Sequence, residues 1–227
     1  MAAQVPADGF QVWRARIIRF AQTESNDLAT FPVFYEFLAE VAASYPDFGL
    51  ELLTEHANPL SRFLIPLIRG IWDGDRKSQL LPLMTRWIDE AAEKETSFLS
   101  ACAKVFLSTR DVDFVILEKI LEKATGLRDV FVIRQVATVA VGRSDSGARN
   151  AELKALFLRA LPRLTELGDA GWVHEIWYRK EATEMVGEFS PDERRSDSIV
   201  LLQDRGMEIN HGYQGRRAHC GPVQVTI

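Results

Sequence analysis

The sequence predicts an all-α protein in which pairs of helices stack on one another. Apolar residues recur with helical periodicity from about residue 8 to residue 204, and turn signals interrupt the pattern at short intervals. Two strings with the same residue pattern, 133–142 and 178–187, lie 45 positions apart. A period of this size in a helical pattern is typical of stacked repeats, in which each unit completes its core against its neighbours.

The two strings carry the same residue at five of their ten positions. The shared residues form the pairs Arg134 and Arg179, Ala137 and Ala182, Thr138 and Thr183, Val141 and Val186, and Gly142 and Gly187. The alanine lets two helix backbones approach closely, and the final Val-Gly packs and then ends the helix. The arginine can donate several hydrogen bonds along a stack.

About eleven helices and no strand are predicted from the periodicity and the turn signals. Their expected spans are 8–22, 28–44, 47–57, 60–72, 76–92, 95–108, 111–125, 128–142, 149–167, 171–187 and 191–204. These helices form one predicted α-solenoid domain, 1–204. The segment 205–227 contains four glycines and no helical period, so we expect a flexible C-terminal extension.

Individual helices show a clear apolar face. In the helix expected at 76–92, Leu80, Met84, Trp87 and Ala91 fall at i, i+4, i+7 and i+11 and so form one continuous stripe. The helix expected at 111–125 has the same division into an apolar stripe and a charged outer face. The stripe consists of Phe114, Leu117 and Leu121, and the charged face of Glu118, Lys119, Glu122 and Lys123.

The ends of the helices carry capping signals. Asp111 and Asp129 stand where an N-terminal cap is expected, because an aspartate side chain accepts hydrogen bonds from the first free backbone N–H groups. Glycines stand where a left-handed C-terminal cap is expected, at Gly126, Gly142, Gly168 and Gly187. Three of the prolines within expected helices lie in closely similar strings. We predict bends near Pro66 and Pro162 and a position close to a helix start for Pro82.

The strings 133–142 and 178–187 resemble HEAT repeats, a family of paired helices that stack into a superhelix. The second helix of a HEAT pair commonly reads Val-Arg, two variable residues, Ala, three variable residues and Leu-Gly, and both strings are similar to it. The first helix often carries a Leu-Leu-Pro-x-Leu string, which 160–164 resembles. Residues 8–92 have helices of repeat-like length without this signature, and other α-solenoids fit them equally.

The resemblance implies a right-handed α-α superhelix of the HEAT or armadillo kind. On its phase, 111–125 pairs with 128–142, and 149–167 pairs with 171–187. It further implies that Arg134 and Arg179 belong to a structural ladder that holds adjacent repeats together.

Composition and charge narrow the class of protein. The chain is 47% hydrophobic and 26% charged, which is enough apolar mass for a core. Its formal net charge of −5 disfavours broad attraction to nucleic acid or to an anionic membrane. Two cysteines, Cys102 and Cys220, imply no disulfide framework, and no basic, apolar leader precedes the first helix. We expect a cytoplasmic protein without a membrane span, in which Cys102 is a small buried hydrophobe.

No specific catalytic or metal-binding motif stands out in the sequence. His174-Glu175 begins like a zinc-protease helix, but Tyr178 occupies the position of the second histidine. His211, His219 and Cys220 lack the spacing of a zinc site. We therefore expect no catalytic residue, no metal and no cofactor.

The most economical function is a non-catalytic scaffold or adaptor that binds another protein or peptide on a concave face, alone or as the recognition module of a larger assembly. The positions beside the arginines, expected to be exposed, are the candidate binding residues: Gln135, Thr138, Lys180 and Glu184. An alternative is a HEAT-repeat DNA-binding protein of the alkylation-repair glycosylase type, in which Trp172 and Trp177 could stack on bases. The acidic charge disfavours this alternative.

Overall fold

The computed structural model describes residues 2–23, 30–93, 96–143 and 150–169. Within these ranges the chain forms ten α-helices, three short 3₁₀ helices and no strand. The prediction of an all-α protein is therefore confirmed for this part of the chain. The helices are η1 (Ala2–Gln4), α1 (Val5–Asp8), α2 (Phe10–Ala21), α3 (Thr30–Ser44), α4 (Pro46–Glu55), η2 (Ser61–Phe63), α5 (Leu64–Trp72), α6 (Lys77–Glu90), α7 (Ser97–Lys104), η3 (Val105–Leu107), α8 (Phe114–Gly126), α9 (Val130–Gly142) and α10 (Asn150–Glu166).

The predicted spans from 8–22 to 149–167 each coincide with an observed helix. Two spans are divided, because 3₁₀ turns occupy the start of 60–72 and the end of 95–108. The spans 171–187 and 191–204 lie outside the described residues, as does the segment 205–227. None of the described helices is both long enough and apolar enough to cross a lipid bilayer.

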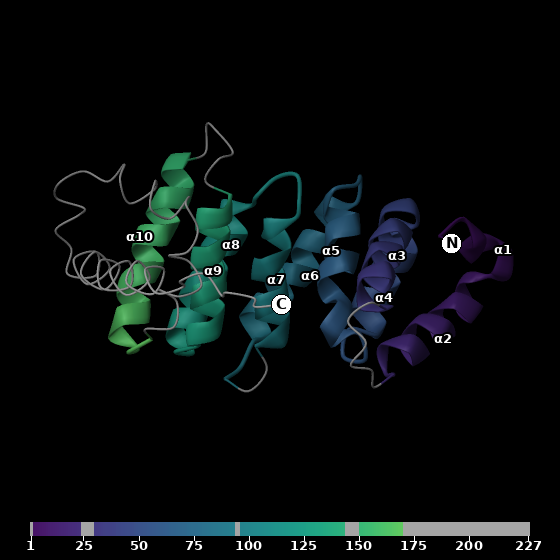
Figure 1. The fold of residues 1–227 in the computed structure, drawn as a ribbon, viewed down its shortest axis with the longest axis horizontal. Helices are drawn as coiled ribbons and strands as arrows, with labels where there is room; N and C mark the ends of the chain where they lie inside the picture. Colours follow the sequence, from purple (N-terminus) through teal and green to yellow (C-terminus); the bar gives the residue numbers. More distant parts are fainter. Residues whose placement is uncertain (1, 24–29, 94–95, 144–149, 170–227) are drawn as a thin grey trace, which may run out of the picture.

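The helices follow one another along the longest axis of the molecule, from α1 and α2 at one end to α10 at the other (Figure 1). Consecutive helices pack together, as do alternate ones: α3 contacts α5, α5 contacts α7, and α7 contacts α9. We call α3, α5, α7 and α9 the odd row. Among the remaining helices, α6 contacts α8 and α8 contacts α10.

The odd row has a regular spacing along the sequence. Its four helices begin at residues 30, 64, 97 and 130, so their starts are 33 or 34 residues apart. This interval is shorter than the 45 residues that separate the two similar strings. The helix starts of the odd row therefore recur at an interval that the two strings do not show.

A close helix contact lies between α3 and α5, where Gly70 faces the α3 backbone. A Cβ atom at Gly70 would overlap the carbonyl oxygen of Ala39, and it would lie 2.8 Å from Cβ of Ala42 and 2.9 Å from the amide nitrogen of Ala43. The absence of a side chain at Gly70 thus lets the two backbones pack directly. Nearly all of α5 is buried around this contact, including Leu67, Ile68, Ile71 and Trp72.

The turn between α8 and α9 places a non-glycine residue in the left-handed region. Arg128 has φ 55°, and its amide donates to Thr125 O at 3.1 Å while the amide of Asp129 donates to Ala124 O at 2.9 Å. These two bonds make a Schellman motif, in which glycine is the preferred residue. The prediction of a left-handed cap at Gly126 is wrong, because Gly126 is the last residue of α8. The same prediction is confirmed for Gly168, which has φ 71°.

We expect Arg128→Gly to raise the free energy of unfolding by about 0.5–1 kcal/mol, because glycine adopts a positive φ without the steric cost that a Cβ imposes. Urea denaturation of the full chain measures this change. Arg86→Gly, in the interior of α6, is the matched control and should lower stability by about 1 kcal/mol. A loss of stability in Arg128→Gly would contradict the expectation.

The other signals at the helix ends have mixed outcomes. Asp129 caps α9 as predicted, since its Oδ1 accepts from the amide of Val132 at 3.0 Å. Asp113, not Asp111, caps α8. Pro66 lies in the first turn of α5, where its missing N–H breaks no helical bond, so the reason for predicting a bend there is absent. The helix-start prediction for Pro82 is wrong, because it is the sixth residue of α6; Pro162 lies inside α10.

Cys102 lies in the core of α7 with no exposed surface, as predicted, and burial raises the pKa of its thiol to about 12. Only the thiolate reacts quickly with disulfide reagents. In a Cys220→Ser variant, we therefore expect Cys102 to react at neutral pH only as fast as the protein unfolds. Labelling with a chromogenic disulfide at increasing urea concentrations tests this. Fast labelling without denaturant would contradict it.

Candidate functional site

Gln135 and Thr138 are the two predicted binding residues that the structure describes. Both lie on α9, which packs against α7, α8 and α10. Gln135 and Thr138 retain only 8% and 9% of their accessible surface, so the expectation that both are exposed is wrong. The Thr138 hydroxyl donates to Arg134 O within the same helix at 2.9 Å. Lys180 and Glu184 lie outside the described residues. Neither Gln135 nor Thr138 is therefore placed to provide a large contact area for a partner.

Arg134 of α9 makes a bidentate ion pair with Asp169. Its Nε donates to Oδ2 at 3.1 Å and its Nη2 donates to Oδ1 at 2.8 Å. The side chains are 18% and 12% exposed, so the pair is largely removed from solvent. Asp169 follows Gly168 at the end of α10. The ion pair therefore fastens α9 to the turn after the next helix. Arg179, the other arginine of the predicted ladder, lies outside the described residues.

Successive turns between helices are tied together by polar contacts. Asp111, in the turn before α8, accepts from Trp72 Nε1 at 3.1 Å and from Lys77 Nζ at 2.6 Å, and these donors are the last residue of α5 and the first residue of α6. The Arg110 amide donates to Asp73 Oδ1 at 2.8 Å. Arg110 O in turn accepts from Arg143 Nη2 at 3.0 Å. The predicted capping role of Asp111 is thus replaced by contacts with the end of α5 and the start of α6.

The hydrogen bond from Lys77 is the main cause of a lowered pKa for Asp111. Because the folded-state pKa lies below the unfolded value, the stabilisation by this carboxylate is present above about pH 4 and is lost as the pH falls through the folded pKa. We expect Asp111→Asn to lower stability by less than about 1 kcal/mol at neutral pH, since the side chain is 48% exposed. The difference from the wild type should shrink below about pH 4 in denaturation curves. A constant difference across this range would contradict the assignment.

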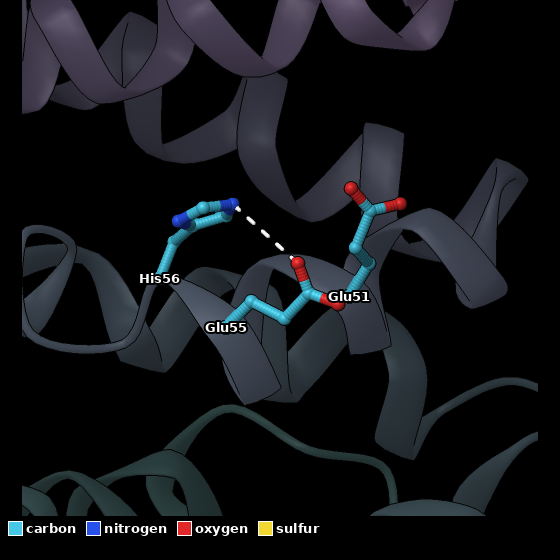
Figure 2. Close-up of side chains that lie close together, drawn as sticks. All are labelled: Glu51, Glu55 and His56. Atoms are coloured by element: carbon cyan, nitrogen blue, oxygen red, sulfur yellow. Dashed lines mark ion pairs between the residues drawn. The ribbon is translucent and has the colours of Figure 1, made fainter.

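Two glutamates and a histidine gather at the end of α4 (Figure 2). Glu51 and Glu55 are four residues apart on one helix face, and His56 follows them, so that one ligand atom from each lies within 4.8 Å of the others. Glu51 already accepts from Arg14 Nη1 at 2.6 Å, and His56 Nε2 lies 4.0 Å from Glu55 Oε2. The arrangement favours ion pairing between α2 and α4.

Phe131 is the large exposed apolar side chain on α9. It keeps 47% of its accessible surface, and the Lys104 ammonium lies 4.7 Å from the centre of its ring. Sequence reasoning missed it, because an aromatic residue in an apolar helix is normally a core residue. On α8, Val115 is 62% exposed and provides a comparison outside the odd row.

Comparison with known proteins found no protein similar to this chain. No family model matches the chain, and no curated protein or solved structure matches it. The class of protein that the described residues define is an all-α protein of consecutively packed helices.

Proposed function

We propose that the chain is a non-catalytic protein-binding scaffold or adaptor, built as a right-handed α-α superhelix of HEAT-like helix pairs. The observation that carries the proposal is the spacing of 33 or 34 residues between the starts of the odd-row helices. Contacts between alternate helices support it, because each unit of a solenoid touches mainly its neighbours. The ion pair of Arg134 fits the ladder role expected for that arginine.

Small residues recur along the odd row at the same spacing. Gly70, Ala103 and Ala137 are 33 and 34 residues apart, and all three are buried. Ala137 belongs to the string that resembles a HEAT second helix, in which alanine permits close helix packing. This series extends the pattern from α9 to α5 and supports a common unit for α5, α7 and α9.

The proposed partner surface follows the odd row, the counterpart of the second helices of HEAT pairs. Binding energy at such a surface comes from a few apolar anchors with a polar rim. We add Phe131 as a proposed anchor because it is exposed, and Lys180 and Glu184 remain the proposed charged contacts on the helix predicted from sequence at 171–187. Because Gln135 and Thr138 are buried, we assign them packing within α9 in place of partner contacts.

Site-specific photo-crosslinking tests this proposal. A benzophenone amino acid is placed at residue 131 in the full chain, and at residue 115 in a matched control that is also an exposed apolar position. We expect a defined protein adduct from cell lysate at 131 and none at 115. The adduct at 131 should be lost on competition with the unmodified chain and weakened by charge reversal at Lys180 or Glu184. Equal labelling at both positions would contradict the assigned surface.

A DNA-binding glycosylase remains the alternative. It requires a positive stripe along the second helices, but the sequence of α9 contains a single basic residue, Arg134, whose guanidinium is paired with Asp169. The helix therefore gives this alternative no support. Release of a damaged base from alkylated DNA by the purified chain, without any protein partner, would replace the scaffold proposal.

A further inference from the structure

A cavity of about 510 Å³ opens where four elements of the odd row meet. Tyr35 of α3, the η2 turn, Ile65 of α5, one face of α7 from its first residue to Lys104, and Phe131 of α9 border it. Its lining includes two cations and four Ser or Thr hydroxyls, and none of its described lining residues is acidic. These six polar residues are Arg62, Lys104, Ser61, Thr96, Ser97 and Ser100. Such a lining is unexpected in a chain with a net charge of −5.

Aromatic rings hold the two cations beside the cavity. The Arg62 guanidinium carbon lies 5.0 Å from the centre of the Phe31 ring, and Lys104 Nζ lies 4.7 Å from that of Phe131. Among the described residues, neither cation forms an ion pair with a carboxylate. A cation–π contact leaves the N–H donors available to an anion, because the ring attracts the charge without accepting hydrogen bonds of ordinary strength.

Ser100 is the most informative residue of the cavity. It is only 8% exposed, yet its hydroxyl forms no hydrogen bond with any described residue although it lines the cavity. The hydroxyl is reached by solvent through the cavity, since it is not one of the enclosed side-chain atoms that lack a partner, and it can donate to a ligand there in place of water.

The start of α7 adds backbone donors next to Ser100. Thr96 is the N-cap residue of this helix, and no described side chain caps its first N–H groups. Thr96, Ser97, Ser100 and Ala101 all line the cavity, so the first turn of α7 borders it. The free N–H groups and the helix dipole favour an anion at such a terminus.

We propose that this cavity binds a phosphomonoester group. Two positive charges match the two negative charges of a phosphomonoester above its second pKa of about 6. Hydroxyls and N–H groups from separate elements match its three terminal oxygens better than the two of a planar carboxylate. The monoester could belong to a phosphorylated side chain or to a small phosphorylated metabolite. The site does not depend on the scaffold function, because it is defined without a protein partner.

Calorimetric titration of the full chain with small probes tests the proposal. Capped phosphoserine represents a phosphorylated side chain and ribose 5-phosphate represents a metabolite. Saturable 1:1 binding of either supports the site, and the tighter probe identifies the source. Capped glutamate and diethyl phosphate should bind at least about tenfold more weakly, because they offer a single negative charge. Equally tight binding of either would overturn the proposal, the diethyl phosphate result indicating a nucleic-acid backbone.

Variants locate the binding in the cavity. We expect Arg62→Gln and Lys104→Gln each to weaken binding of the tighter monoester about tenfold, and Ser100→Ala, which preserves the packing, about fivefold. Lys119→Gln removes an exposed lysine on α8 and should leave binding unchanged. Circular dichroism confirms folding, and if Arg62→Gln unfolds the chain, the other two variants still decide the outcome. Absence of binding, or unchanged binding in Lys104→Gln and Ser100→Ala, would overturn the proposal and leave the scaffold function untouched.

Discussion

Gly70→Ala should lower the free energy of unfolding by about 3 kcal/mol, because its new methyl group has no space. The Cβ would overlap Ala39 O and lie 2.9 Å from Ala43 N, and both atoms belong to the backbone of α3. Backbone atoms cannot rotate away as a side chain can, so α3 and α5 must separate. Urea denaturation monitored by circular dichroism measures the loss.

Gly126→Ala is the matched control for this substitution. Gly126 ends α8, has no positive φ, and has no atom within 4 Å of the position that a Cβ would occupy. Alanine should therefore stabilise the helix end by about 0.5 kcal/mol through its lower unfolded-state entropy. If Gly70→Ala lowered the free energy of unfolding by no more than about 1 kcal/mol, α3 and α5 would tolerate a larger separation. Their close packing would then not determine their relative position.

Helix positions could be predicted because local signals determine them. Apolar stripes such as that of Leu80, Met84 and Trp87 require only the 3.6-residue period, and all three residues are buried as expected. The conformations and contacts of the turns were harder to predict. Arg128 adopts a conformation that its residue type disfavours, so a glycine two positions earlier was the misleading signal. Asp111 accepts hydrogen bonds from the end of α5 and the start of α6, and these contacts depend on how the helices pack and not on the local sequence.

The spacing of the odd-row helices shows a second limit of prediction from sequence. The strings 45 residues apart are visible because they share identical residues, whereas the interval of 33 or 34 residues in the odd row has little identity to reveal it. Gly70, Ala103 and Ala137 share only small size, since close backbone approach selects for volume and not for one residue type. Structure was needed to bring Gly70 into this series.

The predicted binding residues on α9 and the cavity at Ser100 show the same limit of prediction from sequence. Gln135 and Thr138 were expected to be exposed because they are polar, but α9 is packed on several sides and its polar residues are buried with the rest. The cavity at Ser100 could not have been predicted, because its lining comes from elements that are well separated in the sequence and meet only when the helices pack. Polar residue type alone therefore indicated neither site.

Asp169→Ala should lower the free energy of unfolding by about 3 kcal/mol, the lower part of the range for breaking a buried ion pair. The substitution leaves the Arg134 guanidinium, which is 18% exposed, without its bidentate acceptor. Arg134→Met removes the charge as well as the pair. The double variant Arg134→Met/Asp169→Ala should therefore be more stable than the sum of the two single losses implies, and a double-mutant cycle measures this coupling.

Arg163→Ala provides the matched control, because Arg163 pairs with Glu166 on the surface of α10 with side chains 48% and 61% exposed. It should cost less than about 0.5 kcal/mol. The comparison also separates two roles for Arg134. An arginine that holds adjacent helix pairs together lowers stability when it loses Asp169, whereas an arginine reserved for a ligand would leave the unfolding curve of the free chain unchanged. If the unfolding curve of Asp169→Ala matched that of the wild type, the structural-ladder role proposed for Arg134 would be wrong.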